Sequence, residues 1–157
     1  MRVFVDTSAW YALMVPEDSN YEAAQRVFDH LRMTETTLLT TNYIALECTS
    51  LIQRRHGFEA ARAFLARAMD LLDLVWIGED QHAQGMRLWV KSGRRTLSLV
   101  DCTSFWVMRE QGVRQVVAFD AHFREAGFEV LPSADRATER RATYQTGRAR
   151  QAHAKTH

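Results

Sequence analysis

The chain has 157 residues, 46% of them hydrophobic and 25% charged, a composition typical of one soluble globular domain. The formal net charge of +1 by itself indicates no class of partner. No apolar stretch approaches the length of a membrane span, and Asp6 interrupts the N-terminal apolar run too early for a signal peptide. These features argue against a membrane protein and predict a cytoplasmic one, in which Cys48 and Cys102 are buried free thiols.

Short apolar strands alternate with longer helices along the sequence. The first strand, at 3–5, is apolar at every position, as expected for a strand buried on both faces of a parallel sheet. Gly57, Gly93 and Gly112 are typical helix ends. The alternation predicts an α/β fold with a mostly parallel sheet of four or five strands. In chain order, we expect a strand at 3–5, helices at 9–15 and 19–32, a strand at 37–40, helices at 42–56 and 58–71, a strand at 74–77, helices at 79–92 and 101–111, and strands at 116–119 and 128–131.

The charges are unevenly distributed along the chain. Residues 1–132 hold 14 Lys and Arg against 17 Asp and Glu, whereas residues 133–157 hold six against two. The hydrophobic pattern also ends after Pro132, so we predict a domain at 1–132 followed by a basic tail at 133–157 that is loosely helical or disordered. Such a tail can help to bind a polyanion, or it can be a solvated end without a specific role.

Two acidic residues directly follow predicted buried strands. Asp6 follows the strand at 3–5, and Asp120 follows the strand at 116–119. Ligands of open parallel sheets bind beyond the carboxyl ends of the strands. If the two strands are neighbours, both acids therefore point into one crevice.

Two further acids lie on the apolar sides of predicted helices. Glu47 is three residues after Ile44 and four before Leu51, and on this spacing we expect it to share the apolar face of its helix. Asp101 begins a helix whose Phe105 lies four residues later, so it is expected above that apolar face.

Buried carboxylates are costly unless they are paired or bind a cation, and four together would repel one another. A divalent cation is the simplest remedy, and oxygen-only ligands suit Mg²⁺ or Mn²⁺. Each acid also has an ordinary structural explanation. Asp6, Asp101 and Asp120 could be helix caps, and Glu47 could pair with an Arg such as Arg54 or Arg94.

Four stretches, in this order along the chain, resemble the motifs of PIN-domain proteins. They are Val3-Phe4-Val5-Asp6-Thr7-Ser8, the segment 41–47 that ends in Glu47, the segment 96–105 that contains Asp101, and the segment 117–123 that contains Asp120, followed by Gly127-Phe128. The resemblance covers about residues 2–131, and the size of the chain resembles VapC-type toxins of bacterial toxin–antitoxin pairs.

The resemblance implies a three-layer α/β/α fold and an endoribonuclease that depends on Mg²⁺ or Mn²⁺, with Asp6, Glu47, Asp101 and Asp120 as its catalytic, metal-binding acids. Thr7 and Ser104 would support the site. The resemblance further implies an RNA substrate, a homodimer and a cognate antitoxin. Many relatives carry Ser or Thr two residues before the last acid, where this chain has Ala118, so a hydrogen bond near Asp120 is expected to be missing.

Some residues near the acids have two interpretations. Arg94 and Arg95 could contact RNA phosphates or lie in a solvated loop. Trp10 and Tyr11 belong to the core or stack on bases. His122 is interpreted as a packing or capping residue, because a ribonuclease of the histidine-pair type needs two convergent histidines.

Three other functions compete with that of a nuclease. A phosphatase of the haloacid-dehalogenase type is disfavoured because Ser8 stands where its second Asp is required. A non-catalytic PIN fold that only binds RNA or protein is the main alternative. The presence of all four acids argues against it, but Ala118 keeps it open. A purely structural α/β module would keep the four carboxylates far apart.

Overall fold

The computed structural model describes residues 1–133, and the predicted basic tail from residue 134 onward lies outside the described residues. The division of the chain at residue 132 therefore stays a prediction. The strands are β1 (Arg2–Val5), β2 (Thr37–Thr41), β3 (Leu72–Val75), β4 (Gln115–Val117) and β5 (Glu129–Leu131). The helices are α1 (Thr7–Met14), α2 (Tyr21–Met33), α3 (Asn42–His56), α4 (Phe58–Leu71), α5 (Glu79–Ser92), α6 (Leu99–Glu110) and α7 (His122–Glu125).

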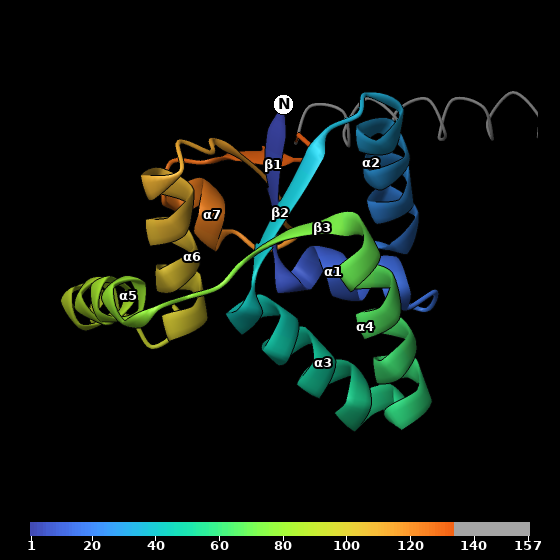
Figure 1. Cartoon of the computed structure of the whole chain (residues 1–157), viewed down its shortest axis with the longest axis horizontal. Helices are drawn as coiled ribbons and strands as arrows, with labels where there is room; N and C mark the ends of the chain where they lie inside the picture. The colour runs from blue at the N-terminus through green and yellow to red at the C-terminus, as the bar shows by residue number, and fades with distance from the viewer. Residues whose placement is uncertain (134–157) are drawn as a thin grey trace, which may run out of the picture.

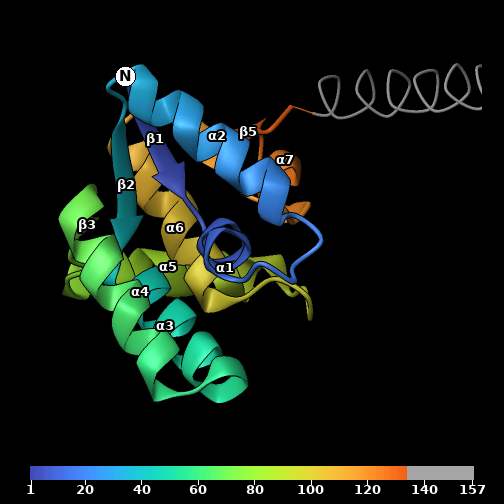
Figure 2. The same ribbon diagram turned by 90° about the vertical axis from the view of Figure 1, so that its right-hand side faces the viewer.

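The strands form one sheet in the order β3-β2-β1-β4-β5, and every pair of neighbours is parallel. Helices α6 and α7 lie on one side of this sheet, and α1 and α2 lie on the other (Figures 1 and 2). The predicted three-layer α/β/α architecture is confirmed. Val3, Phe4 and Val5 of the central strand are fully buried, as their unbroken apolar pattern indicates.

The strand order reverses beside β1, and this places the two strand-end acids together. The chain proceeds from β1 through β2 to β3 in one direction, and β4 and β5 then extend the sheet in the other. Val5 of β1 pairs with Val117 of β4, and the amide of Asp6 donates to the carbonyl of Val117 at 3.1 Å. The crevice at such a reversal is the usual ligand site of open parallel sheets.

Two predicted strands were misplaced at their ends. The strand predicted at 116–119 ends at Val117, because the amide of Phe119 turns to the hydroxyl of Ser8 instead of a strand neighbour. The strand predicted at 74–77 spans Leu72–Val75, because the amide of Ile77 is bound by the side chain of Asn42 outside the sheet. Asp120 therefore lies in a loop after β4 and not directly on its end.

The two cysteines, Cys48 and Cys102, are free and buried, as predicted. None of the helices within residues 1–133 is long and apolar enough to span a membrane.

Helix α5 approaches α6 closely at Gly85, which is buried. A Cβ atom at this position would lie 3.0 Å from the Cα atom of Thr103 and closer still to its hydroxyl oxygen. Only glycine allows the two helices to lie at this distance. Since α6 carries Asp101, this contact also positions one of the predicted site residues.

We expect Gly85→Ala to destabilise the protein. Overpacking costs about 1 to 3 kcal/mol, and the upper part of that range applies here because the atoms in contact include backbone. The gain in helix propensity, about 1 kcal/mol or less, does not offset this. Urea unfolding would measure the loss, and adding Thr103→Ala should restore part of it by removing the nearest oxygen. A double variant no more stable than Gly85→Ala would contradict the explanation.

Candidate metal centre

Asp6 lies between β1 and α1 and is only 4% exposed. It is the N-cap of α1, and its Oδ2 accepts hydrogen bonds from the backbone N of Ser8 at 3.0 Å and from Ser8 Oγ at 2.6 Å. Burial raises the pKa of Asp6 from 3.8 to about 7. The Ser8 hydrogen bonds oppose this rise, and the charges of Asp120 and Asp101 add to it.

Asp101 is the third residue of α6, and it is not the helix cap. Ser98 is the N-cap, and Asp101 completes a capping box with it. Its Oδ2 accepts from the backbone N and from the Oγ of Ser98, both at 2.9 Å. The expectation that Asp101 begins the helix was therefore wrong by two residues. The capping box fixes the carboxylate, which is partly buried.

Asp120 lies in the loop between β4 and α7, where its Oδ1 accepts from the backbone N of His122 at 2.9 Å. Burial raises the pKa of Asp120, the His122 hydrogen bond opposes the rise, and the charge of Asp101 adds to it. The short helix α7 begins two residues after Asp120. Asp120 precedes it and thus contributes both to the local turn and to the acidic site.

Asp6, Asp101 and Asp120 form one cluster. Each offers an oxygen atom, and these oxygens all lie within 4.8 Å of one another. The hydrogen bonds of Asp6 and Asp101 fall on Oδ2 of each residue, and within residues 1–133 the Oδ1 atoms accept none. Three carboxylates with free oxygens at this spacing fit the ligand preferences of a hard divalent cation. Burial is the main cause of the raised pKa values of Asp6 and Asp120, and the charge of Asp101 adds to both.

Glu47 is placed differently from the prediction. Its side chain is exposed, because the buried stripe of α3 is formed by Ile44, Cys48 and Ile52, and Glu47 lies beside that stripe. It is not one of the three clustered acids. However, its Oε2 accepts a hydrogen bond of 2.7 Å from Thr7 Oγ1, and Thr7 directly follows Asp6. Thr7 therefore tethers Glu47 beside the cluster, on its solvent side.

Cys48 is buried, and the charges of Asp6 and Glu47 both act on its thiol. Burial, together with the charges of Asp6 and Glu47, raises the pKa of its thiol to about 12. The thiol therefore stays protonated and cannot be a nucleophile at neutral pH.

Sequence reasoning missed the role of Ser8. Its Oγ donates to Asp6 and accepts from the backbone N of Phe119 at 3.0 Å. One hydroxyl thereby connects the β1 end to the loop that carries Asp120, close to the position where Ala118 lacks a hydroxyl. The only sequence signal was its place two residues after Asp6, which predicts a helix cap and nothing more.

The remaining predicted site residues take no direct part in the cluster within the described chain. Ser104 is buried, and its hydroxyl donates to the carbonyl of Val100 one turn earlier at 2.8 Å. Arg94 pairs with Glu125 at 2.7 Å, at the end of α7. Arg95 is exposed. Supporting or RNA-binding roles for these residues stay predictions.

The family model described as "PIN domain" matches residues 3–129. A protein of Mycobacterium tuberculosis named "23S rRNA-specific endonuclease VapC20" is 36% identical over 132 residues, which cover 83% of this chain and 98% of that protein.

Solved structures of other proteins are also similar to this chain. The crystal structure of VapC20 from Mycobacterium tuberculosis, described as a sarcin-ricin loop cleaving toxin, has a TM-score of 0.72 and 34% identity, and covers 80% of this chain and 95% of its own. VapBC2 from Rickettsia felis, bound to a DNA fragment from its promoter, has a TM-score of 0.59 and 10% identity over 83% of this chain and 97% of its own. At 10% identity, the similarity to VapBC2 shows a shared fold and nothing more.

We expect the stability of the metal-free protein to fall as the pH rises from near 3.8 to about 7. Because the folded chain holds a proton on Asp6 that the unfolded chain has already lost, folding takes up a proton in this window, and raising the pH opposes it. Asp6→Asn should remove most of this decline. Urea unfolding in EDTA at about pH 5 and about pH 8 measures the difference.

The matched control is Asp73→Asn, the same chemical change at an exposed residue of β3, which should keep the decline. If the Asp6→Asn protein loses stability over this window as steeply as the parent, Asp6 is not the titrating group.

Proposed function

The chain belongs to the PIN-domain family, and we propose that it is an endoribonuclease that uses Mg²⁺ or Mn²⁺ to hydrolyse RNA phosphodiester bonds. The observation that carries this proposal is the cluster of Asp6, Asp101 and Asp120 at the reversal of strand order. A fold that only binds RNA would gain nothing from three carboxylates here, because they repel phosphates and the charge of Asp101 adds to the raised pKa values of the buried Asp6 and Asp120. The cluster is useful when a cation is bound.

The donor set argues for a hard divalent ion. All three clustered ligands are carboxylate oxygens, and neither of the nearby cysteine thiols is ionised at neutral pH. Oxygen-only donors favour Mg²⁺ and Mn²⁺ over Zn²⁺ or copper. When bound, such an ion would lower the pKa of a water molecule and offset negative charge on the reacting phosphate.

The residues of the chain supply position and proton transfer. Asp6, Asp101 and Asp120 would hold the metal through their free oxygens, while Ser8 and Ser98 keep the first two carboxylates in place. Glu47 is on the exposed rim, with Oε2 engaged by Thr7. Within residues 1–133 its Oε1 accepts no hydrogen bond, and this oxygen would accept a proton from the attacking water. In-line attack on the phosphate would give a 5′-phosphate and a 3′-hydroxyl.

The extent of the similarity to VapC20 suggests a substrate. That relative acts on 23S rRNA, and 36% identity over 98% of its length supports a similar target, the sarcin-ricin loop, for this chain. From the same similarity we propose that the chain is a cytoplasmic toxin, that it forms a homodimer and that it binds a cognate antitoxin. Arg94, fixed by Glu125 at the end of α7, is a candidate phosphate contact beside Asp120.

We expect the purified protein to cut 23S rRNA into discrete fragments in Mg²⁺ or Mn²⁺, and EDTA to abolish the cleavage. Asp101→Asn should lower kcat at least about a hundredfold, because it removes a metal ligand but can keep the Ser98 hydrogen bonds. Gel analysis with primer extension maps the cut, and melting curves verify that the variant is folded.

Asp73→Asn again serves as the matched control, and it should cleave like the parent. If Glu47 accepts the proton, Glu47→Gln should lower kcat and leave KM nearly unchanged. Metal binding by calorimetry without any cleavage would favour the alternative, a PIN fold that only binds RNA or protein. Cleavage that survives Asp101→Asn and EDTA would contradict the metal-dependent mechanism.

A further inference from the structure

A second group of polar side chains lies on the two helices that frame the acidic cluster. Thr7 and Tyr11 are one turn apart on α1, and Glu47 and Arg55 are two turns apart on α3. The Thr7–Glu47 hydrogen bond joins the helices next to the cluster. Tyr11 Oη joins them again, at 2.9 Å from His56 Nε2 and 3.4 Å from Arg55. The eight residues from Glu47 to Arg55 span about 12 Å of helix.

Tyr11 holds the basic end of α3 in a defined arrangement. The guanidinium of Arg55 lies over its ring, 5.4 Å from the ring centre, and the ring of His56 lies 5.8 Å from it. Arg54 precedes them, and all three basic residues are exposed. No ion pair engages Arg54 or Arg55 within residues 1–133. Basic residues are common at helix ends. A guanidinium that an aromatic ring holds in place, and that has no acidic partner, is positioned to bind an anion.

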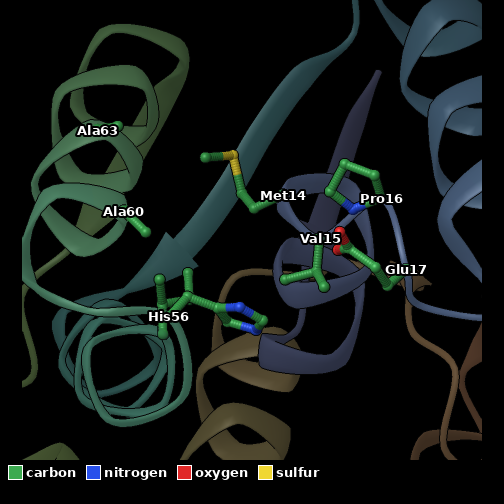
Figure 3. Close-up of a pocket in the computed structure, with 8 residues that line it drawn as sticks. Met14, Val15, Pro16, Glu17, His56, Ala60 and Ala63 are labelled. Carbon is green, nitrogen blue, oxygen red and sulfur yellow. The ribbon is translucent and has the colours of Figure 1, made fainter.

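A cavity of about 270 Å³ opens beside this group. Its walls are mostly apolar and come from the end of α1 and from α3 and α4. Figure 3 shows Met14 and Val15 on one side, Ala60 and Ala63 on the other, and the His56 ring pointing from the end of α3 toward Val15. Glu17 lies at the same side as Val15. His56 thus belongs both to the cavity and to the group around Tyr11.

We propose that Arg55 and the cavity at His56 form a subsite for one nucleotide of the RNA substrate, a few nucleotides away from the bond that is cut. The proposal rests on the proposed ribonuclease function and extends it. Arg55, with Arg54 beside it, binds the phosphate. The base enters the cavity and packs against the His56 ring and the apolar walls.

The charges of the surrounding side chains indicate that the phosphate binds at Arg55 and that the base enters the cavity. Glu17 would repel a phosphate in the cavity, whereas its carboxylate can accept from the amino group of a base. Arg55 and Arg54 present donors that suit a phosphate. Packing on an aromatic ring requires an unstacked base, which is the form of RNA that proteins recognise in loops and single strands. The subsite therefore fits a single-stranded or looped RNA whose backbone runs along α1 and α3.

Arg55→Ala tests the proposal on cleavage. With an oligoribonucleotide that contains the cut site, we expect KM to rise about tenfold while kcat stays nearly unchanged, because Arg55 is remote from the reacting phosphate. When the oligonucleotide is shortened stepwise from each end, one truncation should cost the parent protein the same factor. Arg55→Ala should not be affected by that truncation. Arg32→Ala, at an exposed residue of α2 that pairs with Asp29, is the matched control and should behave like the parent.

Binding provides a measurement that needs no cleavage. In the Asp101→Asn background, fluorescence anisotropy with the same RNA should show about tenfold weaker binding for Arg55→Ala. The slope of log K against log salt should also fall by about one contact. Tyr11→Phe keeps the ring but removes the hydroxyl that contacts His56 and Arg55, and it should give a smaller loss. Melting curves verify folding of each variant.

The outcomes separate the two proposals. Equal KM, affinity and salt slope for Arg55→Ala and its parent would overturn the subsite while leaving the ribonuclease function intact. If the parent binds RNA and Arg55→Ala weakens that binding, but no cleavage occurs, the ribonuclease function fails and the subsite stands. Unchanged RNA binding together with weaker binding of an antitoxin peptide would show that the cavity receives a protein, which also overturns the subsite. No RNA binding at all would overturn both.

Discussion

The parallel pairing of β1 with β4 is the constraint on which the rest of the site depends. Asp6 and Asp120 belong to opposite ends of the described chain, and only this pairing brings them together. The amide of Asp6 extends the ladder to Val117, so the backbone at the acid is itself part of the sheet. Ser8 then connects the same strand end to the loop before Asp120. Asp101 reaches the site because α6 packs beside this edge, at a depth that the glycine contact with α5 allows.

The fold accepts an electrostatic cost at this edge. Three carboxylates share a small volume, and burial leaves Asp6 with a pKa of about 7 in the absence of a cation. Hydrogen bonds from Ser8, Ser98 and His122 offset part of the cost and fix one oxygen of each carboxylate. One oxygen of each carboxylate lies within 4.8 Å of the others. A cation would relieve the repulsion, which is why such an arrangement is retained at functional sites although it lowers stability.

Much of the fold follows from local sequence patterns, and much of the site follows from exceptions to them. The apolar run at 3–5 specifies a buried strand, so an acid at its end stands out. The burial of Glu47 was predicted wrongly, because a stripe of Ile44, Cys48 and Leu51 was expected, whereas the buried stripe continues from Cys48 to Ile52. Ser8 was missed because its second partner, Phe119, is 111 residues away, and no local pattern encodes such a contact. Likewise, the contact between Tyr11 and the end of α3 depends on how two helices pack.

The pairing of β1 with β4 has a consequence for the synthesis of the protein. β1 precedes its neighbour β4 by more than 100 residues, and α6 lies between them in the sequence. Until β4 and the loop after it have been made, Asp6 lacks Asp120, and the sheet lacks the strand that closes the crevice. Pairing these strands closes a long loop at an entropic cost, and it requires β4. A chain that lacks β4 therefore cannot assemble the acidic cluster.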